Sequence, residues 1–268
     1  GTDVGAMALS PDGETLFAAV YDETLTSWTV VKSVDGGYTW KLTEFADDGT
    51  PVIAIEVSPA WEDDGIVVVA TETDLYISEK RGSDFISMGA TGLGTITSID
   101  VALDSDGDAA FVLGTAGAAG EVYLLSGFSG WAPQYIEDPD GSGFGPTGSA
   151  YSFTRGVLAV GFSPNYAEDD VIFAIVGGYA TFFEFVAGEQ GTYLRAESDT
   201  GVNNWGSYIV DAPFIDEPTG DKIVADSACM AFAEDYNSAP AVFVGLTAYV
   251  DIVSYAPMGD AFRVDLVM

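Results

Sequence analysis

Short apolar runs that end in polar corners recur along the whole chain. Five copies of such a run and its corner can be aligned: Ala8–Asp12, Glu56–Ala60, Asp100–Asp104, Gly161–Asn165 and Ala231–Asp235. Counted from Ser10 to its counterparts, successive copies are 48, 44, 61 and 70 residues apart. These intervals are close to the length of a four-stranded propeller blade, with loop insertions late in the chain. The pattern therefore predicts an internal repeat.

Within each repeat, Gly, Asp, Ser and Pro separate four strand-like runs, and few stretches have helical periodicity. The first repeat gives Val4–Leu9, Thr15–Tyr21, Thr26–Lys32 and Thr39–Phe45, and the second gives Val52–Val57, Ile66–Thr71, Leu75–Ser78 and Phe85–Met88. We expect an all-β fold with almost no helix: a β-propeller of four-stranded antiparallel blades, five of them visible, in a single domain of residues 1–268. The approximate blades are 1–46, 47–90, 91–137, 138–212 and 213–268.

A turn motif lies between the third and fourth strands predicted for the first repeat. Its residues, Ser33-Val34-Asp35-Gly36-Gly37-Tyr38-Thr39-Trp40, match the pattern S-x-D-x-G-x-T-W at every defined position. Such residues suit a tight hairpin, because the aspartate accepts backbone N–H bonds, the second glycine can take a positive φ, the hydroxyls tie the ends and the tryptophan packs beneath. Degenerate copies occur at Ser78–Phe85, where Lys80 replaces the aspartate and Asp84 the threonine, and at Ser198–Trp205.

With this motif and the repeated Ser-Pro corners, the whole chain resembles the Asp-box (BNR-repeat) β-propellers. This superfamily includes sialidases, some xyloglucan hydrolases, sortilin-type receptors, photosystem assembly factors and many bacterial surface proteins, and the present chain is similar to its acidic cell-surface and surface-layer members. The resemblance implies that the box is a structural turn, on the face away from the usual active site. The residues expected to stabilise the fold in this way are Ser33, Asp35, Gly37, Thr39 and Trp40.

The charge of the chain excludes several classes of partner. It has 42 Asp and Glu against 8 Lys and Arg, a formal charge of −34, while 48% of its residues are apolar. That apolar fraction supports a folded core, so the charge lies on a folded surface. Such a surface repels polyphosphate and anionic lipid, and we expect no nucleic-acid partner. Strong acidity with little lysine fits an extracellular protein at the cell surface, which stays soluble in salt or collects divalent cations.

The cysteine, histidine and hydropathy patterns narrow the chemistry further. Cys229 is the only cysteine, and its apolar neighbours predict a small core residue, the alternative being a thiol that links to another molecule. The chain has no histidine, which removes Ser-His-Asp triads, Cys-His dyads and HExxH zinc sites. The longest apolar stretch, Val171–Gly188, contains the pair Gly177-Gly178 and Glu184, so it predicts two strands and a turn rather than a membrane helix. We expect no transmembrane segment.

Candidate ligand or partner residues gather on one predicted face, formed by the loops between second and third strands and by the connections between blades. The residues chosen from this face are Asp22, Glu23, Asp138, Asp140, Phe144, Tyr151 and Tyr179. The long insertion Glu137–Arg155 exceeds ordinary connection lengths and is the strongest candidate for a functional loop. A contact with a partner and a solvated excursion are both consistent with it.

A second candidate is a cation site at Asp104-Ser105-Asp106-Gly107-Asp108, which is similar to the first half of a calcium-binding loop. Alternate oxygens from Asp104, Asp106 and Asp108 could converge on a hard cation such as Ca²⁺. The remainder of an EF-hand is missing, because Thr115 stands where the bidentate acid would be. A solvated turn between two strands is the competing interpretation.

Three functions remain open from the sequence. The first is a non-catalytic extracellular structural protein that assembles with itself or with another cell-envelope protein, with Ca²⁺ as a possible bridge. The second is a glycan-binding or glycan-hydrolysing propeller that uses a carboxylate pair. The third is an assembly factor for a membrane complex. Sialidase chemistry is excluded as a leading hypothesis, because it needs three arginines on the substrate and the four present show no such context.

Closure of the ring is a further open point. The first repeat begins with its innermost strand and the fifth ends with its outermost, at Ala261–Val267, so the sequence predicts no exchanged strand that would latch a propeller. Five blades that close without a latch, and a piece of a larger propeller, are both compatible with this order, and we favour the piece.

Overall fold

The structure is a computed structural model and describes most of the chain. The described residues are 2–24, 26–46, 49–116, 120–127, 130–134, 156–178, 191–197, 214–215, 223, 225–233, 235–249 and 257–266. They contain eighteen β-strands and two four-residue helices. The prediction of an all-β fold is therefore confirmed.

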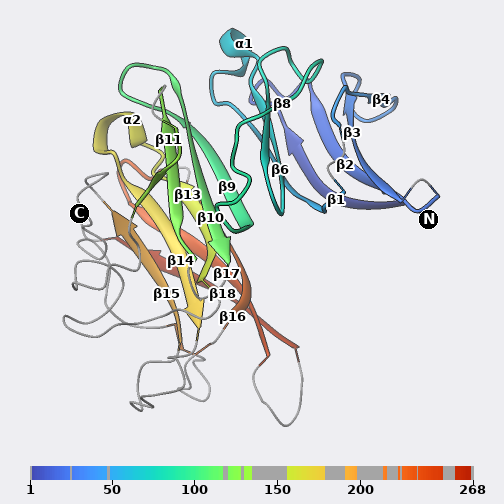
Figure 1. The fold of residues 1–268 in the computed structure, drawn as a ribbon. Helices are drawn as coiled ribbons and strands as arrows, with labels where there is room; N and C mark the ends of the chain where they lie inside the picture. The colour runs from blue at the N-terminus through green and yellow to red at the C-terminus, as the bar shows by residue number, and fades with distance from the viewer. Residues whose placement is uncertain are drawn as a thin grey trace.

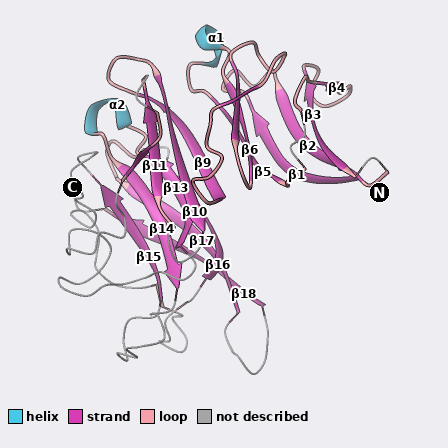
Figure 2. Cartoon of the chain, viewed as in Figure 1, coloured by secondary structure: helices cyan, strands magenta, loops and turns pink. Residues whose placement is uncertain are grey.

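The strands form four antiparallel sheets arranged as a β-propeller (Figures 1 and 2). The first sheet contains β1 (Thr2–Leu9), β2 (Leu16–Asp22), β3 (Ser27–Ser33) and β4 (Lys41–Leu42). The second contains β5 (Val52–Val57), β6 (Val67–Thr71), β7 (Leu75–Ser78) and β8 (Ile86–Ser87). In both sheets each strand pairs with the next one in sequence, as a blade requires.

The remaining strands form one large and one small sheet. The large sheet contains β9 (Thr95–Leu103), β10 (Ala109–Ala116), β11 (Val122–Ser126), β12 (Ala132–Pro133), β13 (Gly156–Phe162), β14 (Ile172–Gly178) and β15 (Gly191–Glu197). The small sheet contains β16 (Ala225–Phe232), β17 (Ala241–Tyr249) and β18 (Pro257–Asp265). Helices α1 (Trp61–Asp64) and α2 (Tyr166–Asp169) are single turns.

The number of sheets differs from the prediction of five separate blades. The third and fourth predicted blades share the large sheet, because β10 pairs with β13 as well as with β9. That link is a single register pair, Ala116 with Gly156. On either side of it the chain still runs as two antiparallel meanders. We number the five meanders as units 1 to 5: β1–β4, β5–β8, β9–β12, β13–β15 and β16–β18.

The first strand of each unit lies against the first strand of the next. Contacts run from β1 to β5, from β5 to β9, from β9 to β13 and from β13 to β16. Figure 1 shows the units in sequence along an arc, with β1 and the β16–β18 sheet well apart. The apolar core fills the spaces between neighbouring units, because each of units 2 to 4 buries one face against the unit before it and one against the unit after it.

The polar corners repeat in three dimensions. Ser58 Oγ donates a hydrogen bond to Asp64 Oδ2 at 2.5 Å, and Ser163 Oγ donates to Asp169 Oδ2 at 2.7 Å. Each short helix follows its corner and begins with a buried aromatic residue, Trp61 or Tyr166 in the two cases. A serine hydroxyl and a nearby carboxylate thus satisfy the turn before the second strand of units 2 and 4.

Candidate functional site

The Ser33–Trp40 turn joins β3 to β4, and its side chains bond with one another. Thr39 donates to the Asp35 carboxylate twice, from its backbone N–H at 2.9 Å and from its hydroxyl at 2.6 Å. Ser33 Oγ donates to Asp35 at 2.8 Å and accepts the Gly37 N–H at 2.9 Å. Trp40 Nε1 donates to the Gly37 carbonyl at 3.0 Å, although the indole stays 38% exposed. All five residues serve the turn itself.

These bonds also explain the electrostatics of Asp35. Hydrogen bonds from Thr39, and then from Ser33, favour the ionised carboxylate and lower its pKa to about 2. The carboxylate is exposed but fully engaged within its own turn. We therefore assign it to the stability of the hairpin and not to acid–base chemistry.

The corresponding turn of unit 2 reverses the roles of the two polar positions. Lys80 occupies the place of Asp35, and Asp84 occupies the place of Thr39. Lys80 Nζ lies 2.8 Å from Asp84 Oδ2, so an ion pair spans the turn where unit 1 has a hydroxyl–carboxylate bond. The ion pair raises the pKa of Lys80. Ser78 keeps its place and accepts the Gly82 N–H at 3.0 Å.

The predicted ligand face is described in part. Asp22 ends β2 and accepts the Thr24 N–H at 2.7 Å, and Glu23 is exposed in the following turn. Five other predicted residues lie outside the described residues: Asp138, Asp140, Phe144, Tyr151 and Tyr179. Of the predicted set, only Asp22 and Glu23 can therefore be placed, and the ligand face stays a prediction.

Beside Asp22 is a hollow of about 340 Å³ at the junction of units 1 and 2. Tyr21 and Trp28 line it with their rings 5.3 Å apart, and Thr26, Gly49 and Pro51 complete its wall. This is the same loop end of the sheet on which the sequence placed a ligand face. An aromatic pair in such a hollow can stack on an apolar face of a neutral ligand.

The Asp104–Asp108 turn uses one of its three carboxylates to hold its own backbone. Asp104 Oδ1 accepts the N–H groups of Asp106 and Asp108 at 3.0 and 2.9 Å, and Asp104 Oδ2 accepts the Ser126 hydroxyl at 3.0 Å. In the described part of the chain, no group of three or more acidic or cysteine side chains is placed to hold a metal ion. Calcium binding at this turn stays a prediction.

A pair of carboxyl groups on the inner strands was not anticipated. Glu56 lies on β5 and Asp100 on β9, at equivalent positions of the repeat. Burial raises the pKa of Glu56 to about 8, with a further contribution from the charge of Asp100. Burial also raises the pKa of Asp100, to about 6, against two backbone hydrogen bonds that lower it. At neutral pH one proton is therefore retained, on Glu56.

Asp100 has a clear structural role. Its carboxylate accepts the N–H of Phe162 on β13 at 2.7 Å and its neighbour Val101 N–H at 2.8 Å. Ser98, two residues earlier, accepts the Val160 N–H of the same strand at 2.7 Å. Side chains of β9 thus take the place of a backbone ladder between the inner strands of units 3 and 4. The repeat alignment places the two acids at equivalent positions, 44 residues apart, but no local pattern indicates that the strands carrying them lie side by side.

The outer face of unit 1 is apolar and uncovered. Four large side chains on it are exposed: Val4 (57%), Met7 (57%), Leu9 (56%) and Leu42 (73%). Cross-strand pairing places Met7, Ala18, Val31 and Leu42 in one row on this side of the sheet, opposite the side that packs on unit 2. We call this surface the leading face.

Cys229 is a correction to the sequence analysis. It lies on β16 and is exposed, not part of the core as predicted. The strand alternates, and its even-numbered neighbours Ala228, Met230 and Phe232 are the ones that pack on unit 4. An apolar neighbourhood in sequence indicates a strand, but the side of the sheet that is covered depends on which units flank it.

The comparisons with known proteins concern the fold. No protein-family model matches the chain, and no curated protein matches it in sequence. Solved structures do match. YCF48 bound to D1 peptide is 12% identical with a TM-score of 0.52, over 97% of this chain and 67% of that one. The GH74 xyloglucanase from Xanthomonas campestris is 15% identical with a TM-score of 0.56, over 94% of this chain and 38% of that one.

Hydrazine synthase from Kuenenia stuttgartiensis is 12% identical with a TM-score of 0.59, over 98% of this chain and 62% of that one. The chain thus spans between about a third and two thirds of the lengths of these proteins. The neighbours include β-propeller proteins, and the chain has a β-propeller fold. Among the described residues, neither helix is long or apolar enough to cross a membrane.

Proposed function

We propose that this chain is a non-catalytic structural protein of the cell surface, which binds other proteins through its leading face. The observation that carries the proposal is the leading face itself. Its four exposed side chains form an apolar patch on the order of 400 Å², about the size of the largest patch on a typical soluble monomer, which is often functional. On a chain with a formal charge of −34, an uncharged patch of this kind stands out.

Two further features support a structural role. The residues of the strongest sequence motif are engaged within their own turn, and Asp100 fastens one strand to another. The acidity fits an extracellular surface that must stay soluble in salt, and it makes Ca²⁺ a natural bridge between acidic faces. One structural neighbour, YCF48, was solved with a bound peptide, which is a precedent for protein binding on this fold. A scaffold for a membrane complex would use the same surface.

The test is made in the organism that encodes the chain. Leu42→Glu places a charge on the leading face, and Ile86→Glu is the matched control, because Ile86 is 61% exposed on β8 of unit 2. We expect the unmodified chain and the control to stay with the cell envelope and Leu42→Glu to be released into the medium. The same fractionation is repeated in EDTA to test the calcium bridge. Recovery of the unmodified chain in the cytosol, or equal retention of all three, would overturn the proposal.

A second function is favoured by the Tyr21–Trp28 hollow. Its aromatic walls suit a neutral glycan, and two of the structural neighbours are GH74 enzymes. We expect Tyr21→Ala to abolish any binding detected by calorimetry with a panel of neutral oligosaccharides. Release of reducing ends from the same panel, abolished by Glu56→Gln, would move the assignment to a hydrolase. If no oligosaccharide gives a measurable heat of binding, the glycan hypothesis is excluded.

A further inference from the structure

Half of the cations of this acidic chain lie at the junction between units 1 and 2. Lys32, Lys41, Lys80 and Arg81 are four of its eight lysines and arginines. Lys32 is on β3 and Lys41 on β4 of unit 1, whereas the other two are in the turn between β7 and β8 of unit 2. Lys32 Nζ donates a hydrogen bond to the Arg81 carbonyl at 2.8 Å, so the two groups meet across the junction.

Lys32 and Lys41 form an unfavourable pair. They are register partners in the β3–β4 ladder, and like charges directly opposite each other destabilise a sheet. They are on the face that packs on unit 2, because Val30, two residues before Lys32, belongs to the core between these units. Partial burial, and then the charges of Lys41 and Arg81, lower the pKa of Lys32. The fold thus holds three cations together against their mutual repulsion.

Arg81 is held in a backbone conformation that glycine usually occupies. It stands at the position of Gly36 in the unit 1 turn, and both residues have a positive φ, +54° for Arg81 and +73° for Gly36. Its guanidinium lies over the Trp61 ring at 5.1 Å, and its Nη2 donates to the Glu62 carbonyl at 2.8 Å. Its Nε and Nη1 donate no hydrogen bond within the described part of the chain, so these N–H groups are available to a ligand.

The carboxylates around these cations are largely engaged elsewhere. Asp84 pairs with Lys80 at 2.8 Å, so that cation is neutralised. Asp12 faces Arg81 from unit 1, but it accepts two hydrogen bonds within its own corner. Among the described residues, no ion pair includes the remaining three cations. We call these three the basic patch: Lys32, Lys41 and Arg81.

The turn between the two lysines adds apolar and aromatic surface to the basic patch. Tyr38 and Val34 are 90% and 63% exposed, and the hydrogen bonds of Asp35 fix the turn that carries them. Tyrosine and arginine are enriched at the centres of protein interfaces. A ligand that has both carboxylates and apolar groups matches this surface. A polyphosphate matches the cations alone, and the formal charge of −34 repels it.

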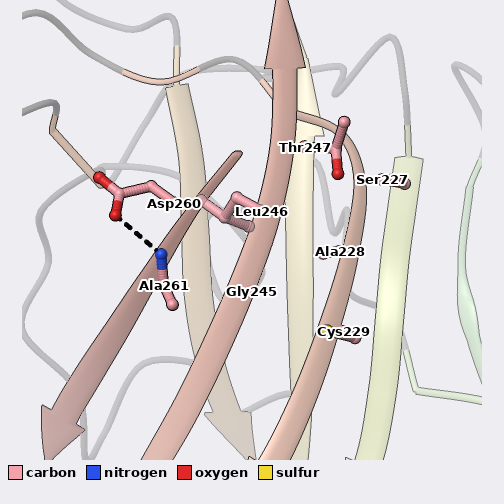
Figure 3. A pocket seen from close by; sticks show the side chains of 8 residues that line it. All are labelled: Ser227, Ala228, Cys229, Gly245, Leu246, Thr247, Asp260 and Ala261. Carbon is pink, nitrogen blue, oxygen red and sulfur yellow. Dashed lines mark hydrogen bonds between the residues drawn. The ribbon is translucent and has the colours of Figure 1, made fainter. Parts of the chain in front are cut away.

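The larger hollow on unit 5 has a different character (Figure 3). It measures about 480 Å³ and is lined mainly by small residues of β16, β17 and β18. The charged residue among those that line it is Asp260, whose carboxylate accepts the Ala261 N–H at 2.8 Å. An anionic ligand is therefore attracted to the basic patch and not to this hollow.

We propose that the basic patch binds an acidic segment of a partner protein, in which carboxylates are interspersed with apolar side chains. One carboxylate would bridge Lys32 and Lys41 and remove their repulsion, and a second would accept the available N–H groups of Arg81. Apolar side chains of the segment would lie on Tyr38. This inference goes beyond the proposed function, because the basic patch faces unit 2 and the leading face is on the other side of the same sheet.

The test measures binding of a fluorescein-labelled peptide, in which Glu alternates with Ser and Leu, to the purified chain by fluorescence anisotropy. A peptide with Gln in place of Glu is the ligand control. We expect only the Glu peptide to bind, and its affinity to fall about tenfold between 0.05 and 0.5 M NaCl. Lys41→Ala should weaken binding about threefold, and Lys32→Ala combined with Lys41→Ala about tenfold.

Two variants are matched controls for the protein. Arg263→Ala changes the formal charge by the same amount, but Arg263 is on β18 and pairs with Asp265 at 2.8 Å. Leu42→Ala removes a side chain of the leading face next to Lys41. We expect both to bind the Glu peptide as the unmodified chain does. Circular dichroism shows whether each variant is folded, and Lys41→Ala is the decisive one because its amine forms no bond in the described part of the chain.

Three outcomes would overturn the proposal. The Glu peptide could fail to bind the unmodified chain. Lys41→Ala and Arg263→Ala could weaken binding equally, which would mean that net charge alone governs it. An oligophosphate could bind more tightly than the peptide and displace it, which would assign the patch to a polyanion instead of a protein. Retention of Leu42→Glu in the cell envelope contradicts the proposed function only, so the two failures are distinguishable.

Discussion

At the scale of the residue, two carboxyl groups of this chain have opposite pKa shifts because their surroundings differ. Asp35 accepts bonds from hydroxyls and backbone N–H groups in water, and its pKa is lowered to about 2. Glu56 is placed between the inner strands, and its pKa is raised to about 8. The two groups therefore respond to pH in opposite directions.

Replacement of Asp35 by Ala removes the acceptor for the Thr39 N–H, the Thr39 hydroxyl and the Ser33 hydroxyl. We expect a lower unfolding temperature near neutral pH. Because the folded-state pKa is depressed, the contribution is present above pH 4 or so and is lost as the pH falls toward 2. The difference between variant and unmodified chain should thus shrink in acid. Asp106→Ala, an exposed turn acid, is the control in a thermal melt monitored by circular dichroism.

Glu56 should make the fold less stable as the pH rises. In the native chain it keeps its proton up to about pH 8, whereas in the unfolded chain it loses it near pH 4.3. The native state therefore holds the extra proton between these values, and the free energy of unfolding falls with rising pH by up to about 1.4 kcal/mol per pH unit. Asp100 adds to the slope only below about pH 6.

We expect Glu56→Gln to flatten this dependence between pH 6 and 8, as measured by urea unfolding at several pH values. Glu62→Gln, on the exposed surface of α1, should leave the slope unchanged. Equal slopes for the unmodified chain and Glu56→Gln would show that Glu56 is ionised in the folded state.

At the scale of the element, the inner strands are held by side chains as well as by packing. β9 reaches β13 through Asp100 and Ser98, and Thr97 donates to the Val157 carbonyl at 2.8 Å. These bonds satisfy backbone groups at a junction where the two strands do not form a regular ladder.

Asp100→Ala should destabilise the chain by about 1–3 kcal/mol, because two N–H groups lose their acceptor at a partly buried site. Hydrogen exchange of the Phe162 amide should accelerate with it. Asp106→Ala serves again as the control in urea unfolding. Unchanged protection of the Phe162 amide would mean that another acceptor replaces the carboxylate.

Much of this element structure was predictable from the sequence. Gly and Asp-rich corners between β-branched runs located β5 and β7 to the residue and β6 to within one residue, since local turn chemistry decides where strands end. The shared sheet of units 3 and 4 was not predictable, because the pairing of Ala116 with Gly156 joins residues far apart in sequence. The proximity of Glu56 to Asp100, the exposure of Cys229 and the leading face could not be predicted either. Each depends on which face of a sheet packs against a neighbouring unit, and no local sequence pattern specifies that.

At the scale of the whole molecule, a formal charge of −34 opposes any association of copies. Salt screens that repulsion, since the Debye length falls from about 30 Å at 0.01 M to about 10 Å at 0.1 M ionic strength. We expect association through the leading face to strengthen as NaCl is raised from 0.01 to 0.5 M, as followed by light scattering. Magnesium chloride at matched ionic strength separates screening from divalent bridging. Complexes that dissociate as salt increases would show that ion pairs, and not the apolar leading face, hold them.

The repeated contacts between units also bear on how such a protein changes in evolution. The first strand of each unit packs on the first strand of the next, from β1 to β5, from β5 to β9, from β9 to β13 and from β13 to β16. Because one kind of contact is used four times, a unit copied within the chain would meet neighbours of the kind it had before. Whole units can therefore be gained or lost inside such a chain without a new kind of junction.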